Sequence, residues 1–244
     1  RQYGRDLVNL LRGDLGTSLF SRRPVLSLIG EQLPSTLELA LAAMFVALIL
    51  GVGLGILAAV KRRTWWDRLA MSFSIAGVSL PIFWTALLLI WLLSLRLGWL
   101  PATGAGSPAH LVLPALVLGF ASAGAIARLV RASLLEVLSQ DYVNTARAKG
   151  LSEGLVLLRH AVRNALIPVI TIAGLQFGFL LGGAVVTETI FARPGIGRLL
   201  VNAIQWKDLT LVQGIALLAA VTYTLVNLAV DLAYVVLVPR IRYD

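Results

Sequence analysis

The sequence predicts an all-α polytopic membrane protein with five transmembrane helices in this chain. Of its 244 residues, 58% are hydrophobic and only 14% are charged, and the mean hydropathy is +0.86. A soluble domain has about 25% charged residues, so this composition excludes an ordinary water-soluble protein. The apolar residues form continuous runs and do not alternate with polar ones. This pattern favours helices over barrel strands, because a helix satisfies its own backbone hydrogen bonds in lipid.

Five apolar runs are the predicted spans, and most reach the ~20 residues needed to cross a bilayer. The third run, 111–127, is the shortest, and it can be extended to residue 130 only by including the charged residue Arg128. The runs cover residues 36–60, 69–95, 111–127, 166–190 and 211–238. They divide the chain into an extracytoplasmic segment, 1–35, and a transmembrane domain, 36–244, which contains a cytoplasmic loop at 128–165.

The basic residues predict this topology. They gather in the turn before the second span, in the 128–165 loop, and after the last span, at Arg240 and Arg242. Because Lys and Arg are enriched on the cytoplasmic side, these segments and the C-terminus are expected inside. Residues 1–35 are then outside, although they lack the apolar core of a signal peptide. We therefore expect an additional upstream span, six in all, with unaided translocation of the N-terminus as the alternative.

Several function classes find no support in the sequence. The chain has no cysteine and two distant histidines, so no thiolate, metal or Ser/His/Asp site is predicted. No phosphate-binding loop occurs, and Gly51, Gly53 and Gly55 lie inside an apolar run, where close helix packing is their expected role. The net charge of +9 comes mostly from the Lys and Arg residues of the predicted cytoplasmic segments. The sequence predicts no soluble basic domain that could bind nucleic acid. Any ATPase that drives this protein must be another chain.

The 128–165 loop carries a short charged helix, a glycine corner and a second helix. Residues 142–149 favour a helix, Gly150 can adopt the left-handed conformation that ends it, and Ser152 can cap the next helix. An apolar stripe is expected on the second helix at Leu155, Leu158 (or Val156), Val162 and Leu166. Two interpretations remain open from these residues. The element docks a partner, or it lies as an amphipathic hairpin on lipid headgroups.

Six motifs in order resemble one family, the permeases of ATP-binding-cassette (ABC) importers, and within it the dipeptide/oligopeptide/nickel branch. Asn144-Thr145-Ala146 followed by Gly150 is similar to the E-A-A-x-x-x-G motif of these permeases. The other motifs are Arg12-Gly13-Asp14-Leu15-Gly16-Thr17-Ser18, Leu33-Pro34-Ser35-Thr36-Leu37-Glu38-Leu39, Arg159-His160-Ala161-Val162-Arg163-Asn164, Phe191-Ala192-Arg193-Pro194-Gly195-Ile196-Gly197-Arg198 and the ending around Asn227-Leu228-Ala229-Val230-Asp231-Leu232. The resemblance covers essentially the whole chain. It departs from the general motif at Asn144, where Glu is usual, at Thr145 and at Arg163.

The resemblance implies a type I ABC importer transmembrane domain in a bacterial or archaeal inner membrane. It implies a second homologous permease, two ATPase subunits that bind ATP and Mg, and an extracytoplasmic solute-binding protein; this chain itself holds no cofactor and catalyses nothing. The helix before Gly150 would be the coupling helix that docks on an ATPase. The residues expected at this contact are Asp141, Asn144, Thr145, Ala146, Arg147, Lys149, Gly150, Leu151, Ser152 and Arg163.

The substrate and its path are less defined by the sequence. Di- or oligopeptides are the expected substrates, with nickel, glutathione or another small solute as alternatives. Ser79, Pro81, Gln176 and Asp231 are candidates for the pathway or the bundle interior. For Asp231, the single acidic residue we place well inside a span, a structural hydrogen bond and a pathway role are the two interpretations. A secondary transporter is the alternative class, although no convincing internal repeat is present.

Overall fold

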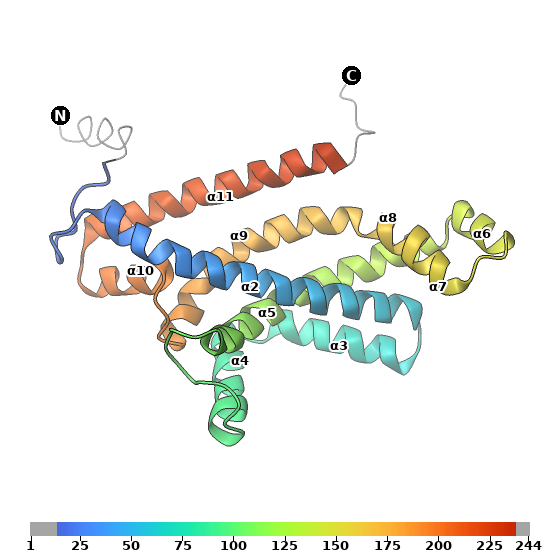
Figure 1. Cartoon of the computed structure of the whole chain (residues 1–244), viewed down its shortest axis with the longest axis horizontal. Coiled ribbons are helices and arrows are strands. Elements are labelled where there is room, and N and C mark those ends of the chain that lie inside the picture. The colour runs from blue at the N-terminus through green and yellow to red at the C-terminus, as the bar shows by residue number, and fades with distance from the viewer. Residues whose placement is uncertain (1–13, 238–244) are drawn as a thin grey trace.

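The computed structural model describes residues 14–237, and within them all side chains except those of 183, 230, 231 and 233–237. The described residues are mostly helical, and the long helices run roughly along one axis, while the segment Ile82–Arg96 projects away from it (Figure 1). The elements, with η marking π-helical segments, are α2 Val25–Val60, α3 Trp65–Ser79, α4 Ile82–Leu89, η1 Ile90–Arg96, α5 Ala109–Leu138, α6 Asp141–Ala148, α7 Glu153–Leu155, η2 Val156–Val162, α8 Arg163–Ala165, α9 Ile167–Ile190, α10 Ile196–Gln205 and α11 Leu209–Leu237. Three helices among the described residues can span a membrane by length and composition, and up to five spans result if two bent pairs each count as one. The all-α membrane fold is thus confirmed.

The packing of α2 on α5 forms the centre of the bundle, and small residues allow it. A Cβ atom added at Gly51 would lie 2.7 Å from Ile126 Cβ, and one at Gly55 would lie 2.6 Å from Val130 Cβ. A Cβ atom added at Gly119 of α5 would likewise lie 2.6 Å from Val46 Cβ of α2. Only glycine fits at these crossing points, so Gly51 and Gly55 serve helix packing, as predicted. Gly53 points elsewhere, with nothing within 4 Å of its added Cβ.

Two helices extend beyond the predicted spans, because tertiary packing continues past the apolar runs. The helix α2 begins at Val25 and not at residue 36, and it includes Pro34. Its first turns bury Val25 and Ile29 against α10 and α11, contacts that a local apolar pattern cannot show. The helix α5 continues beyond residue 127 to Leu138, where Leu134 packs in a cluster with residues of η2 and α8.

The second predicted span is not one straight helix. The segments Trp65–Ser79 and Ile82–Arg96 meet at an angle of 110°. The break lies at Leu80, which is extended (φ −79°, ψ 132°), and Pro81. A proline has no N–H to continue the helix and disfavours a helical residue before it, so the bend follows from the sequence at this point. A second bend, of 50°, separates Glu153–Ala165 from the helix that begins at Ile167.

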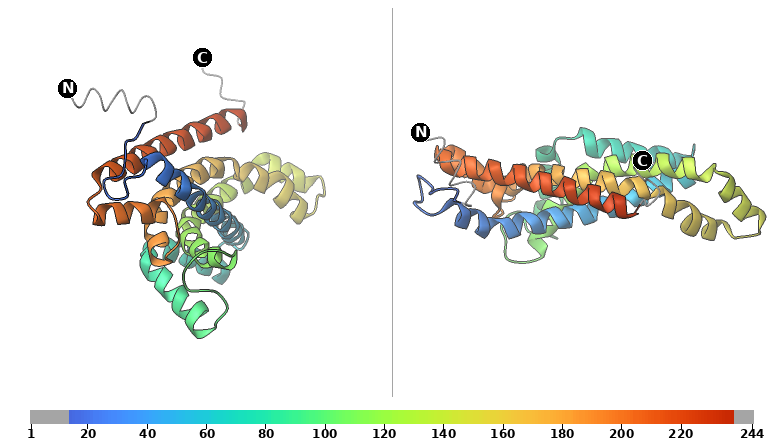
Figure 2. Two further views of the ribbon diagram at one scale, coloured as in Figure 1. Left: turned by 60° about the vertical axis from the view of Figure 1, so that its left-hand side comes forward. Right: turned by 90° about the horizontal axis from the view of Figure 1, so that it is seen from above.

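The two ends of the bundle are formed by different segments. The α2–α3 turn and the segment α6–α8, all predicted to be cytoplasmic, lie at one end of the molecule, while α10 and residues 14–24 lie at the other (Figure 1). At that second end, Phe20 stacks on Trp206, with ring centroids 4.3 Å apart. The helix α11 starts there and runs along one side of the bundle (Figure 2). Only 17% of its most apolar stretch is buried, so most of its surface remains uncovered by this chain.

Candidate functional site

The candidate site is the short helix α6 and the turn that follows it. The backbone of Gly150 has a φ of +79°, in the left-handed region, and its N–H donates to the carbonyl of Arg147 at 2.9 Å. The predicted glycine corner is therefore confirmed. An added Cβ at Gly150 meets nothing within 4 Å, so the position requires glycine for its backbone conformation and not for lack of space.

Apolar contacts seat α6 on the end of α5. Val143 and Ala146 are buried, and they pack with buried Val156 of η2. Val137 and Leu138, at the end of α5, pack against this cluster. Ala146, predicted to touch a partner, therefore belongs to the support beneath α6. A small apolar residue at this position lets the helix lie close to its neighbours.

Polar contacts brace α6 against the following segment. The Tyr142 hydroxyl accepts a hydrogen bond from Asn164 Nδ2 at 2.8 Å and donates to the carbonyl oxygen of His160 at 3.3 Å. Across the glycine corner, Arg147 Nε lies 2.8 Å from Glu153 Oε1. Our sequence analysis missed both contacts. The opposite charges at Arg147 and Glu153, on either side of a predicted corner, were the signal that could have revealed the second.

The segment after the corner differs from the predicted amphipathic helix. Leu155 and Leu158, predicted to lie on an apolar stripe, are 41% and 68% exposed. The buried residues are Val156, Ala161 and Ala165. The cause is the π-helical segment η2, whose wider turn places residues five apart on one face. Ser152 occupies the predicted N-cap position, but its side chain makes no capping hydrogen bond.

The remaining candidate coupling residues are available for contact with another molecule. All of them have exposed side chains, except Gly150, which exposes its backbone; they are Asp141, Asn144, Thr145, Lys149, Gly150, Leu151, Ser152 and Arg163. Arg147 is partly covered, because it turns toward Glu153 and also lies 3.3 Å from Asn144 Oδ1. The arrangement presents a polar helix face on a rigid support.

The structure describes the side chains of three of the four candidate pathway residues. Ser79 and Pro81 are exposed at the 110° bend. Gln176 of α9 is half-buried and its Nε2 lies 3.5 Å from the carbonyl oxygen of Ser122 in α5. The side chain of Asp231 lies outside the described part of the chain. A cavity of about 360 Å³ opens between α2, α9, α10 and α11, and its described lining does not include Ser79, Pro81 or Gln176.

A buried carboxylate near the opposite end was overlooked in the sequence. Glu188, inside the fourth predicted span, is fully buried and accepts a hydrogen bond from Thr36 Oγ1 at 2.6 Å. Thr36 Oγ1 in turn accepts from the N–H of Ile196 at 2.8 Å. Glu188 lies two residues from the end of the predicted 166–190 span, where the sequence analysis assigned it no role. Among the described residues, no group of three His, Cys, Asp or Glu side chains could hold a metal ion.

Comparison with known proteins gives consistent results at the level of family and fold. Residues 51–243 match the family described as "Binding-protein-dependent transport system inner membrane component". The chain is 48% identical over 242 residues to the "Glutathione transport system permease protein GsiC" of Escherichia coli strain K12, covering 99% of this chain and 79% of that protein. The protein of the same name from Pectobacterium atrosepticum is 47% identical over the same length.

Two solved structures have the same fold. The MetNI methionine ABC transporter, in an inward-facing conformation, has a chain that superposes with a TM-score of 0.73 at 19% identity, covering 85% of this chain and 94% of that one. A chain of an amino acid ABC transporter crystallised with histidines gives a TM-score of 0.62 at 16% identity, covering 88% and 94%. At these identities the likeness concerns the fold alone.

Proposed function

Because the chain belongs to the family of binding-protein-dependent transport system inner membrane components, we propose that it forms half of the path by which short peptides enter the cell. It is a permease subunit of an ABC importer and not an enzyme. Permeases of this kind work with ATPase and binding-protein components in general. The specific set proposed here is one second, homologous permease, two ATPase subunits and one extracytoplasmic solute-binding protein.

The braced helix α6 is the observation that carries the mechanism. It is followed by a glycine in the left-handed conformation, which is unfavourable for most residues with a side chain, and it is held to its own chain by both apolar and polar contacts. A helix fixed in this way moves with the elements that support it. In the proposed cycle, closure of the ATPases on ATP and Mg shifts α6, and the shift changes the packing of α5 and α9. Such a change between two packings opens the path to one side or the other.

The proposed roles divide the candidate residues into two groups. Ala146 and Arg147 hold the helix in place, the first by packing and the second through Glu153. The exposed residues Asp141, Asn144 and Lys149 face outward and would contact the ATPase surface. Since Asn144 replaces the Glu of the general motif, the contact at this position uses an amide and not a carboxylate. The remaining exposed residues, Thr145, Leu151, Ser152 and Arg163, extend the same surface.

Short peptides are the proposed substrate class, and glutathione is the first to test. The support is the 48% identity to permeases that are named for glutathione transport. In this proposal the binding protein selects the solute, and the permease accepts what is delivered. The membrane is the bacterial inner membrane, with α6 and the C-terminus on the cytoplasmic side.

Reconstitution of the complete complex in proteoliposomes tests the function. With the binding protein outside and ATP inside, radiolabelled glutathione or a dipeptide is expected to accumulate, and omission of ATP is expected to abolish uptake. Peptide uptake by the permease pair without ATPases would contradict the ABC mechanism and favour a secondary transporter. ATP-dependent uptake of another solute, with no peptide uptake, would contradict only the substrate class.

A further inference from the structure

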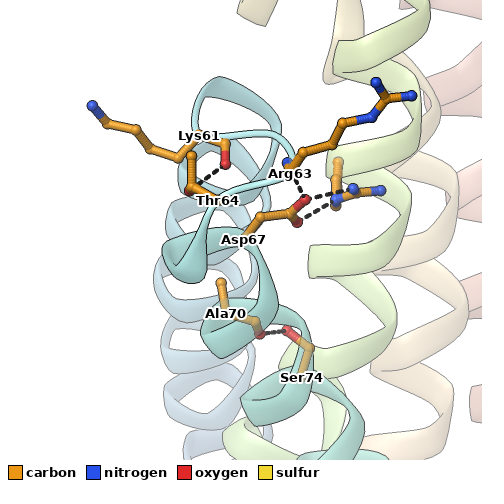
Figure 3. Close-up of polar contacts among 7 residues, drawn as sticks. Lys61, Arg63, Thr64, Asp67, Ala70 and Ser74 are labelled. Carbon is orange, nitrogen blue, oxygen red and sulfur yellow. Dashed lines mark hydrogen bonds and ion pairs between the residues drawn. The ribbon is translucent and has the colours of Figure 1, made fainter.

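The turn between α2 and α3 carries a dense group of cations that the rest of the described chain leaves unpaired. Lys61, Arg62, Arg63 and Arg68 all have exposed side chains. None of the four side chains makes a hydrogen bond or ion pair with the described residues. Figure 3 shows the Lys61 and Arg63 side chains extending away from the turn on opposite sides. We refer to these four residues as the turn cations.

The one acidic residue of this turn does not neutralise the turn cations. Asp67 is 6% exposed, and both of its carboxylate oxygens are engaged by Arg131 of α5, each at 2.8 Å (Figure 3). The same carboxylate accepts a hydrogen bond from the backbone N–H of Arg63 at 3.0 Å. The Asp67 carboxylate thus bonds to α5 and to the backbone of the turn. The Asp67 charge is paired with Arg131, and of the turn cations only Arg62 also interacts with it electrostatically, so most of the positive charge of the turn is left without a counter-charge.

The hydrogen bond to Asp67 also fixes how the turn displays its side chains. Arg63 has a φ of +63°, a left-handed conformation that is unfavourable for a residue with a side chain. Thr64 Oγ1 donates to the carbonyl of Lys61 at 2.5 Å and closes the turn from the other side. The strained turn is therefore held in one shape. Its cations project from a defined frame and not from a loose loop.

Two tryptophans place this frame at the level of lipid headgroups. Trp65 and Trp66 form the start of α3 and are 65% and 55% exposed. Exposed tryptophans at the end of an apolar helix sit at the boundary between hydrocarbon and water. Both views of the long axis show that α6 projects farther along that axis than the α2–α3 turn does (Figures 1 and 2). A partner docked on α6 therefore leaves the turn nearer to the bilayer.

We propose that the α2–α3 turn binds the phosphate headgroup of anionic phospholipids. Clusters of Lys and Arg beside a membrane helix attract anionic lipid, and each charge near the surface contributes to the affinity. The turn cations supply the charge, Trp65 and Trp66 supply the interfacial contact, and Asp67 with Arg131 holds the turn in shape. The site is independent of the transported solute and of ATP.

A lipid titration of the purified permease complex, followed by native mass spectrometry, tests the proposal. Phosphatidylglycerol is the anionic probe and phosphatidylcholine is the neutral one. The variant Arg62→Gln/Arg63→Gln/Arg68→Gln is expected to bind phosphatidylglycerol at least tenfold more weakly, with phosphatidylcholine binding unchanged. The control Lys149→Gln/Arg159→Gln/Arg163→Gln removes three exposed cations from the neighbouring segment and is expected to keep the anionic preference.

Two results would overturn the proposal. Equal loss of phosphatidylglycerol binding in both triple variants would show only a general attraction to positive charge. Full retention of that binding in the turn variant, with loss of co-purifying ATPase, would show that the turn contacts a protein partner. A melting temperature close to that of the parent complex in neutral detergent is expected for the turn variant, because the exchanged side chains are exposed and make no hydrogen bond or ion pair with the described residues.

Discussion

The carboxylate of Glu188 caps the first turn of α10, with its Oε2 2.8 Å from the backbone nitrogen of Gly197. The same oxygen accepts a second hydrogen bond, from the N–H of Arg198 at 3.2 Å. A side-chain acceptor at this place satisfies backbone N–H donors that a helix start leaves free. The Glu188 carboxyl group can lie this close to the start of α10 because position 195 has no side chain. A Cβ atom added at Gly195 would lie 2.1 Å from Glu188 Cδ. The glycines of the Pro194–Arg198 motif therefore make room for Glu188.

Replacing Gly197 by alanine is expected to destabilise the protein by about 1–3 kcal/mol, the range of overpacking substitutions. Its added Cβ would lie 2.4 Å from Val185 Cα, a backbone atom of α9 that cannot rotate away. Thermal unfolding in detergent measures the effect. Gly53→Ala is the control, because it also adds one methyl to a glycine within a helical segment but meets nothing within 4 Å. Equal melting temperatures for the two variants would contradict this account.

Substitutions at Gly150 separate backbone conformation from side-chain size. Gly150→Val is expected to abolish ATP-dependent uptake, because a β-branched residue disfavours the left-handed conformation at φ +79°. Gly150→Asn is expected to retain much of the uptake, since asparagine tolerates that conformation and the space around the position is open. Both variants should insert in the membrane at normal levels. Equal uptake by the two would mean that the corner conformation is unimportant for coupling.

The sequence predicted features that are local in the chain. The helix ending at Gly150 and the packing role of Gly51 and Gly55 follow from residue type and spacing, and both are confirmed. The bend at Pro81 was not predicted, because a continuous apolar run does not show whether its helix is straight or bent. The role of Glu188 depends on Thr36, 152 positions away in the chain, and no local pattern connects them. The coupling roles and the pathway residues stay predictions.

A charge exchange tests whether Arg147 acts through Glu153. Arg147→Glu places two carboxylates across the glycine corner and is expected to lower coupled uptake several-fold. Adding Glu153→Arg restores an opposite pair in reversed order and is expected to recover a large part of the activity. The pair is largely exposed, so its effect on global stability should be below about 1 kcal/mol. Uptake by reconstituted complexes, normalised to bound ATPase, is the measurement.

The double variant distinguishes bracing from direct docking. If Arg147 instead contacts the ATPase by its charge, the exchanged pair would remain as inactive as Arg147→Glu alone. Lys149→Glu provides the comparison, because Lys149 is exposed and has no ion-pair partner among the described residues. Its loss of function is not expected to be rescued by any change at Glu153.

Asp208 is expected to make stability depend on pH at the α10 end of the bundle. Burial alone would raise the pKa of Asp208, but hydrogen bonds from Ser18 and from the N–H groups of Leu211 and Phe20 outweigh it and lower the pKa below its usual range. A carboxyl group with a lowered folded-state pKa stabilises the protein above the unfolded-state pKa of about 4. That contribution is lost as the pH falls through the folded-state pKa.

Asp208→Asn removes the charge and leaves only one acceptor oxygen. The variant is expected to unfold more easily than the parent protein at pH 7, by about 1–3 kcal/mol. The difference between the two proteins should shrink as the pH falls below about 4. Melting curves in detergent across this range provide the measurement. A difference that stays constant from pH 7 to the acid end would show that the charge of Asp208 is unimportant.

Single cysteines at the two ends of the bundle test the orientation. The chain has no cysteine, so an introduced one is the sole reactive thiol. Ser21 and Ser152 are both exposed serines, and they lie in segments at opposite ends of the molecule (Figure 1). In cells with a permeable outer membrane and an intact inner membrane, an impermeant thiol reagent is expected to label Ser21→Cys. Ser152→Cys should react only after the inner membrane is opened, because the basic residues of its segment belong on the cytoplasmic side. The opposite labelling pattern would invert the topology, and α6 could then not reach an ATPase that uses cytoplasmic ATP.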